Sequence, residues 1–185
     1  MAGLLFYTQH NRKLSFYIFF ASCFAVGIVV EMIGTSTGWL FGEYRYGTVL
    51  GPGIRSVPFI IGVNWFIIIY CCGVCIQVLL SKLTAKLSEQ TALPAKSIQT
   101  LSVVIDGATL AVMLDWLIEP VAVKLGYWTW LGTGEIPLYN YICWFAVSIL
   151  LLLVFKSLDF NKQNKFAVNL LLIQAMFFLL LRTFL

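Results

Sequence analysis

Five long apolar runs constrain this chain more than any other feature. A helix needs roughly 20 mainly apolar residues to cross a bilayer, and only 11% of the residues here are charged, against about 25% in soluble domains. Lipid offers the backbone no hydrogen bonds, so spanning segments are helices or closed barrels, and no alternating strand pattern is present. We therefore predict an all-α polytopic membrane bundle in a single integral membrane domain, residues 1–185. Its expected helices are about 14–34, 57–80, 101–121, 139–155 and 166–183.

Lysine and arginine residues predict the orientation of this bundle, because segments rich in them stay on the cytoplasmic side. We expect the first apolar run to be retained as a helix, since it is longer than a signal-peptide core and contains Glu31. With a cytoplasmic N-terminus, eight basic residues lie inside and four outside. We therefore expect a multi-pass cell-membrane protein with its C-terminus outside and no nucleic-acid partner. The inner residues are Arg12, Lys13, Lys82, Lys86, Lys96, Lys156, Lys162 and Lys165, and the outer ones are Arg45, Arg55, Lys124 and Arg182.

Two stretches hold most of the residues that are unusual for membrane helices. Residues 31–65 open with Glu31, pass through a loop rich in glycine and aromatic residues, and enter another apolar helix. Residues 115–144 begin with two acidic residues, and Pro120 is expected to bend or end their helix. A similar loop follows. By contrast, the last apolar run has few such residues and is expected to act as a lipid-facing support or as a contact with a second copy.

The two stretches share a spacing that suggests an internal repeat. Seven residues separate Pro58 from Trp65, and seven separate Pro137 from Trp144. Each loop also contains an aromatic-x-aromatic triplet. Both helix pairs cross the membrane in the same direction, so the pattern predicts a parallel two-helix repeat about an axis normal to the membrane. It places both loops and the nearby carboxylates toward the outer half of the bilayer. The triplets are Tyr44-Arg45-Tyr46 and Trp128-Thr129-Trp130.

Three carboxylates are the candidate catalytic residues. Ionisable groups inside membrane spans are costly and usually functional. Asp115 and Glu119 are four residues apart and therefore share one helix face. Two such groups in a dry setting hold a proton between them near neutral pH, and protonation of an alkene requires a proton-bearing acid. Glu31 would complete a cluster of three, whereas Asp106 is about half a turn out of phase with Asp115 and is expected to face elsewhere.

The aromatic and amide residues of the two stretches are candidates for substrate binding. A second interpretation is purely structural: tryptophans such as Trp39 form an interfacial belt, and amides bond neighbouring helices. In this interpretation Glu31 and Glu119 lie at the interface and pair with Arg45, Arg55 or Lys124. A belt alone does not explain the tyrosines of the first loop or the tryptophans inside the helices. The candidates are Trp39, Tyr44, Tyr46, Asn64, Trp65, Trp128, Trp130, Asn140 and Trp144.

Several kinds of cofactor site are absent from the sequence. A single histidine cannot build a histidine-rich di-iron centre, and no phosphate-binding glycine motif occurs. The cysteines of Cys71-Cys72-x-x-Cys75 lie mid-helix without a partner histidine, so we interpret them as packing thiols. The sequence therefore favours acid–base chemistry on an apolar substrate, without metal or cofactor.

Each of the two stretches contains a set of short motifs. The first set is Glu31-x-x-Gly34-x-x-x-Gly38, Phe41-Gly42-x-Tyr44-x-Tyr46, Leu50-Gly51, Val57-Pro58 and Trp65-Phe66. The second is Asp115-x-x-x-Glu119-Pro120, Trp128-x-Trp130, Gly134, Ile136-Pro137, Asn140 and Trp144. These motifs, which cover residues 31–66 and 115–145, about a third of the chain, are similar to those of the carotenoid biosynthesis membrane family, which includes bisanhydrobacterioruberin and γ-carotene hydratases. Glu135-Ile136-Pro137 departs from the family pattern, which often has Tyr before Gly-Val-Pro.

The resemblance implies a hydratase that adds water across a terminal C=C bond of an acyclic carotenoid in the bilayer. Asp115 or Glu119 would protonate the alkene, aromatic faces would stabilise a tertiary carbocation, and Glu31 would direct and deprotonate the water. One alternative is a lycopene-type carotenoid cyclase, in which an internal alkene captures the cation. Another is a non-catalytic protein that binds a carotenoid or lipid. Expected partners are the carotenoid, a second copy and other enzymes of the carotenoid pathway.

Overall fold

The computed structural model describes residues 1–87 and 96–185, and these form a bundle of helices with short strands at one end. Five of the helices are long and apolar enough to cross a membrane, which confirms the predicted fold class. The helices are α1 (Ala2–Thr8), α2 (Leu14–Thr37), α3 (Phe59–Leu87), α4 (Lys96–Lys124), α5 (Leu138–Ser157) and α6 (Lys165–Phe184). The strands are β1 (Tyr44–Tyr46), β2 (Gly53–Ile54), β3 (Val57–Pro58) and β4 (Trp128–Trp130).

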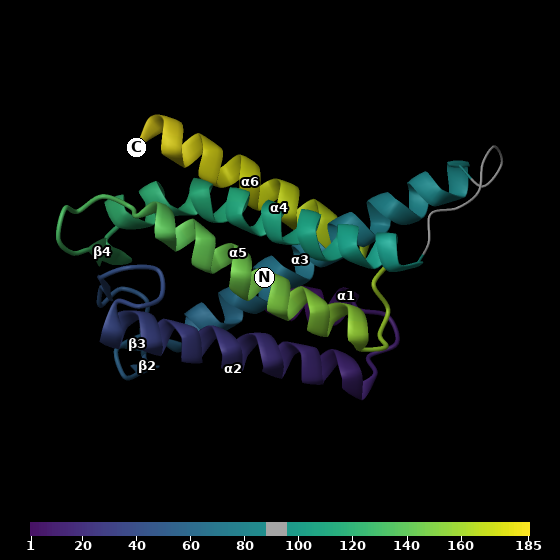
Figure 1. The fold of residues 1–185 in the computed structure, drawn as a ribbon, viewed down its shortest axis with the longest axis horizontal. Coiled ribbons are helices and arrows are strands. Elements are labelled where there is room, and N and C mark those ends of the chain that lie inside the picture. Colours follow the sequence, from purple (N-terminus) through teal and green to yellow (C-terminus); the bar gives the residue numbers. More distant parts are fainter. Residues whose placement is uncertain (88–95) are drawn as a thin grey trace.

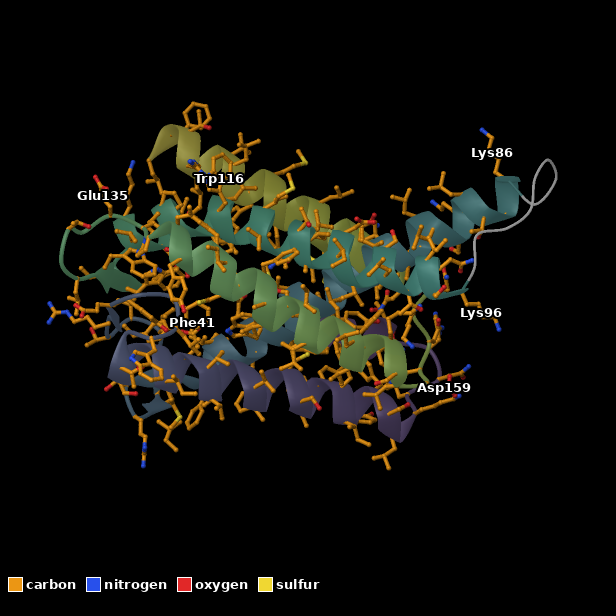
Figure 2. All side chains as sticks on the ribbon, in the orientation of Figure 1. Phe41, Lys86, Lys96, Trp116, Glu135 and Asp159 are labelled. Atoms are coloured by element: carbon orange, nitrogen blue, oxygen red, sulfur yellow. The ribbon has the colours of Figure 1, made fainter. Side chains whose placement is uncertain are left out.

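The axes of the long helices are roughly aligned with the long axis of the molecule, and the strands lie beyond one end of the helices (Figure 1). Lys86, Lys96 and Asp159 lie at the opposite end, whereas Glu135 lies at the end with the strands (Figure 2). All five long helices are longer than expected, α3 and α4 most of all. In these two the helical structure continues beyond the apolar runs, to Leu87 in α3 and from Lys96 in α4. These polar turns stay helical because leaving the apolar layer does not by itself end a helix.

Helix α3 forms the centre of the bundle and packs against α2, α4, α5 and α6. Residues 65–72 are buried on every side of the helix, as expected for a helix that is apolar all round. A glycine brings α2 close to it: a Cβ added at Gly27 would lie 2.7 Å from the ring of Trp65. Small residues allow such close approach between membrane helices, and here the approach fixes the Trp65 indole against α2.

The two halves of the chain meet through corresponding residues. Strands β1 and β4 pair antiparallel, with Arg45 opposite Thr129 at the centre of the register. Within the bundle, the indoles of Trp65 in α3 and Trp144 in α5 stack with their ring centroids 3.9 Å apart and their planes 12° from parallel. Both pairings join equivalent positions of the two stretches, which agrees with the predicted two-helix repeat.

Candidate active site

Glu31 lies in the last turns of α2 with its carboxylate turned into the protein. It is 5% exposed and accepts three hydrogen bonds. Tyr44 and Tyr46 donate their hydroxyls to Oε2 at 2.5 and 2.6 Å, and Trp65 Nε1 donates to Oε1 at 3.0 Å. A buried carboxylate is tolerated when such donors replace water. The lone ion pair among the described residues joins Lys13 to Asp159, so the interpretation of Glu31 as an interfacial carboxylate paired with a cation is wrong.

The donors to Glu31 are placed by the local geometry of the first loop. Residues two apart on a strand face the same side, so Tyr44 and Tyr46 point together while Arg45 points out to solvent. Gly34, one turn after Glu31, leaves room for this: a Cβ there would lie 2.7 Å from the Tyr44 hydroxyl. Burial, followed by the charge of Glu31, raises the pKa of both tyrosines above the ordinary value. Both phenols therefore stay protonated and act as donors.

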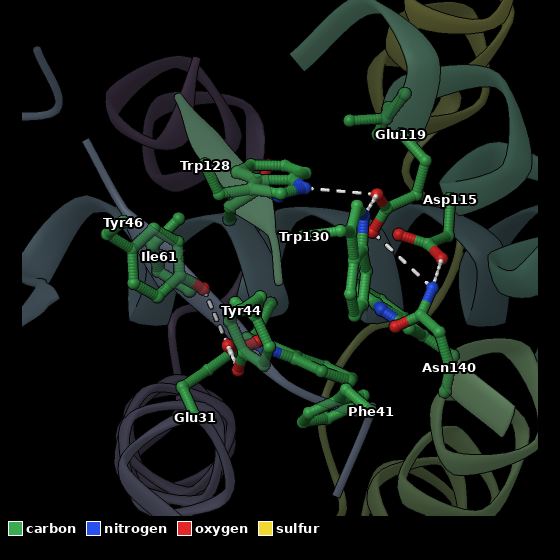
Figure 3. A pocket seen from close by; sticks show the side chains of 14 residues that line it. Glu31, Phe41, Tyr44, Tyr46, Ile61, Asp115, Glu119, Trp128, Trp130 and Asn140 are labelled. Carbon is green, nitrogen blue, oxygen red and sulfur yellow. Dashed lines mark hydrogen bonds between the residues drawn. The ribbon is translucent and has the colours of Figure 1, made fainter. Parts of the chain in front are cut away.

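The second pair of carboxylates faces the same region from α4. Glu119 Oε2 accepts from Trp128 Nε1 and Trp130 Nε1, each at 3.0 Å. Asn140, in the first turn of α5, donates from Nδ2 to Asp115 Oδ2 at 3.0 Å and to Glu119 Oε1 at 3.4 Å (Figure 3). Both carboxyl groups are buried, at 2% and 3% exposure. The predicted shared face is therefore confirmed, and one amide nitrogen bridges the two groups.

The three carboxyl groups differ in how many donors they have. Glu31 and Glu119 each accept three side-chain hydrogen bonds, whereas Asp115 accepts one within the part of the chain that the structure describes. Donated hydrogen bonds stabilise the ionised form of a carboxyl group. Asp115, which is also the most buried of the three, therefore gains least from being ionised.

A small cavity lies between these carboxyl groups and the aromatic rings. Its volume is about 30 Å³, which holds one or two water molecules, so the end of a polyene can enter only when the lining side chains move apart. Aromatic faces and carboxyl oxygens together suit a site that delivers a proton and stabilises a cation. Eleven of the predicted site residues line it: Glu31, Tyr44, Tyr46, Asn64, Trp65, Asp115, Glu119, Trp128, Trp130, Asn140 and Trp144.

Trp39 is the predicted site residue that the structure does not bring to the cavity. It is 79% exposed and makes no part of the lining, so it lies outside the cavity. Its position beyond the end of α2 fits the belt interpretation. Asp106 is also outside the site, as expected, because it is exposed and accepts a hydrogen bond from Ser102 one turn earlier. Cys71 and Cys72 are buried free thiols in α3.

Three lining residues were not predicted: Phe41, Ile61 and Ile118. Nothing separates the two isoleucines from other apolar residues of membrane helices. Phe41 is buried and has a φ of 68°, a left-handed conformation that is uncommon for a bulky residue. Its place between two glycine-rich turns could have predicted that Phe41 lies inside the protein, because such a loop folds back onto the protein rather than into solvent.

Known proteins resemble this chain over most or all of its length. A family model described as "Carotenoid biosynthesis protein" matches residues 1–185. Bisanhydrobacterioruberin hydratase from Haloarcula japonica is 27% identical over 129 residues, which make up 68% of this chain and 40% of that protein. The chain thus spans less than half the length of this curated relative. No solved structure matches the chain.

Proposed function

We propose, from the premise that this chain belongs to the carotenoid biosynthesis protein family, that it is a hydratase acting on the terminal C=C bond of an acyclic carotenoid. One observation carries the proposal. A water-sized cavity has a buried carboxyl group with a single donor on one side, Asp115, and a carboxylate with three donors, Glu31, across from it (Figure 3). Aromatic rings fill the space around both. The name of the similar Haloarcula protein supports the same reaction class.

Asp115 is the proton donor in this proposal. Glu119, held as an anion by two indoles and an amide, leaves the proton of the pair on Asp115. The Asp115 hydroxyl gives this proton to the less substituted carbon of the terminal double bond. The π electrons form the new C–H bond, and a tertiary carbocation remains on the neighbouring carbon.

The lining of the cavity stabilises this cation. The faces of Tyr44, Trp130 and other rings attract it, each by roughly 2 kcal/mol or more in a desolvated site. The carboxylates of Glu31 and Glu119 add fixed negative charge in surroundings of low dielectric constant, where such charge is most effective. The reaction needs only one water molecule beside the cation. The cation is either captured by this water or loses a proton and returns to the alkene.

Glu31 receives the second proton. A water molecule in the cavity attacks the cation through its oxygen, and its surplus proton passes to the Glu31 carboxylate. The product is a tertiary alcohol. Transfer of a proton from Glu31 back to Asp115 restores the starting state, so the net reaction consumes one alkene and one water. With the N-terminus in the cytoplasm, this chemistry takes place in the outer half of the membrane.

Expression in a bacterium that makes lycopene or γ-carotene tests the proposal. Mass spectrometry of the pigments is expected to show a gain of one water per modified end. An unchanged mass with altered absorption would instead indicate a cyclase. Asp115→Asn is expected to keep the pigment bound and abolish conversion. Full conversion by Asp115→Asn, Glu119→Gln and Glu31→Gln would refute the assignment of the carboxyl groups.

A further inference from the structure

Pro120 leaves one backbone carbonyl of α4 without its helical partner. Proline has no N–H, so it cannot donate to the carbonyl four residues earlier, which belongs to Trp116. The two residues directly follow the two carboxyl groups of the site, since Trp116 comes after Asp115 and Pro120 comes after Glu119. Contrary to one of the two expectations for this proline, α4 does not end there but continues to Lys124. The missing bond therefore lies inside the turn that carries both carboxyl groups.

An arginine from another helix fills this gap. Arg182, in the last turn of α6, donates from a terminal guanidinium nitrogen to the Trp116 carbonyl oxygen at 2.7 Å. Its guanidinium carbon also lies 3.6 Å from the centroid of the Trp116 ring. Trp116 extends from α4 beside the C-terminal part of α6 (Figure 2). The described residues include no carboxylate paired with Arg182, so these two contacts define its position.

We propose that Arg182 is a positioning residue for the reaction: it replaces the backbone donor that Pro120 lacks and thereby fixes the α4 turn between Asp115 and Glu119. This inference rests on the proposed function of those carboxyl groups. In lipid, an unpaired carbonyl is costly, and a break in the helical ladder lets the helix bend. Bending at this turn would change the distance of Asp115 from Glu119 and of both from Asn140.

The plain alternative is that Arg182 and Trp116 only anchor their helices at the membrane interface, where both residue types are common. The alternatives differ in one respect. An interfacial anchor does not depend on whether residue 120 has an N–H. A replacement donor does, because alanine at position 120 restores the bond within the helix and makes the arginine dispensable.

A double-mutant cycle on the full chain separates them. The variants are Arg182→Gln, Arg182→Lys, Pro120→Ala and the Pro120→Ala/Arg182→Gln pair, and Arg12→Gln, exposed at the other end, is the matched control. In membranes, Arg182→Gln is expected to lower kcat by about 10- to 100-fold with little change in KM, since misplacement of about 1 Å costs on that order. Arg182→Lys, which retains a donor, is expected to recover most of the loss. In the Pro120→Ala background, removal of Arg182 is expected to cost less than about threefold.

Hydrogen exchange of the backbone amides of residues 117–119 and 121–124, in purified protein, tests the same cycle without requiring the reaction. Arg182→Gln is expected to speed exchange there by at least about tenfold with Pro120 present, and to leave it unchanged in the Pro120→Ala background. Equal effects of Arg182→Gln in both backgrounds, on kcat or on exchange, would overturn the inference, and so would an unchanged kcat. If the wild type converts no carotenoid, the proposed function fails and the catalytic role of Arg182 fails with it, whereas exchange still decides whether Arg182 replaces the missing donor.

Discussion

Asn140→Leu tests whether the bridge between the two α4 carboxyl groups controls catalysis. Leucine has nearly the shape of asparagine, so the substitution keeps the packing of the first turn of α5 and removes the amide. Asp115 then loses the one side-chain donor that it has among the described residues, and Glu119 keeps its two indoles. The proton donor is left without orientation while the rest of the cavity is unchanged.

The geometry sets the expected size of the effect. The bond from Asn140 to Asp115 has the usual length of 3.0 Å, whereas the bond to Glu119, at 3.4 Å, is long and weak. Removal of the donor leaves the buried Asp115 acceptor unsatisfied, which costs about 1–3 kcal/mol. Because about 1.4 kcal/mol corresponds to a tenfold change in rate, Asn140→Leu is expected to slow hydration by about 5- to 150-fold.

The assay is the initial rate of hydrated carotenoid formation in membranes, normalised to the amount of folded protein. Asn169→Leu, the same substitution at an exposed position of α6, is the matched control and is expected to retain the wild-type rate. Retention of more than half the rate by Asn140→Leu, in protein with wild-type near-ultraviolet circular dichroism, would refute the argument that Asn140 orients the acid.

Three further predictions concern the first half of the site and its surroundings. Gly34→Ala introduces a Cβ 2.7 Å from the Tyr44 hydroxyl, so it is expected to separate Tyr44 from Glu31 and to lower the conversion rate about tenfold or more; an unchanged rate would contradict the proposed clash. Tyr46→Phe removes one of two donors to Glu31 Oε2 and is expected to reduce the free energy of unfolding by about 1–3 kcal/mol, measured by denaturation in mixed micelles, with no reduction contradicting a role for that bond. Trp39→Ala, outside the cavity, is expected to change the conversion rate by no more than about twofold, and a larger loss would return Trp39 to the site.

Local periodicity accounts for the parts of the site that sequence reasoning found. Apolar runs of sufficient length predict the spans, and a spacing of four places Asp115 and Glu119 on one face whatever surrounds them. The seven-residue spacing likewise anticipated that Trp65 and Trp144 occupy equivalent places, although nothing in it predicted that their rings would touch.

Features that depend on contacts between distant segments were not readable. Trp39 and Tyr44 lie in the same loop with similar neighbours, yet the first is exposed and the second is buried, because the loop turns inward between them at Phe41. The last helix was expected to be a lipid-facing support or a contact with a second copy, without a role in the chemistry. The loss of a donor at Pro120 is visible in the sequence, but its replacement from Arg182, more than sixty positions later, is visible only in the folded chain.

The stacked indoles of Trp65 and Trp144 give the protein an internal optical reporter. Two nearly parallel indoles 3.9 Å apart couple their electronic transitions, and such coupling produces paired circular dichroism bands of opposite sign when the two transition dipoles are twisted relative to each other. The amplitude of these bands depends on the separation between α3 and α5 where Trp65 and Trp144 line the cavity. Separation of the two indoles, by heat, by detergent or by an incoming polyene end, can therefore be followed in unlabelled protein, with Trp144→Phe as the spectral blank.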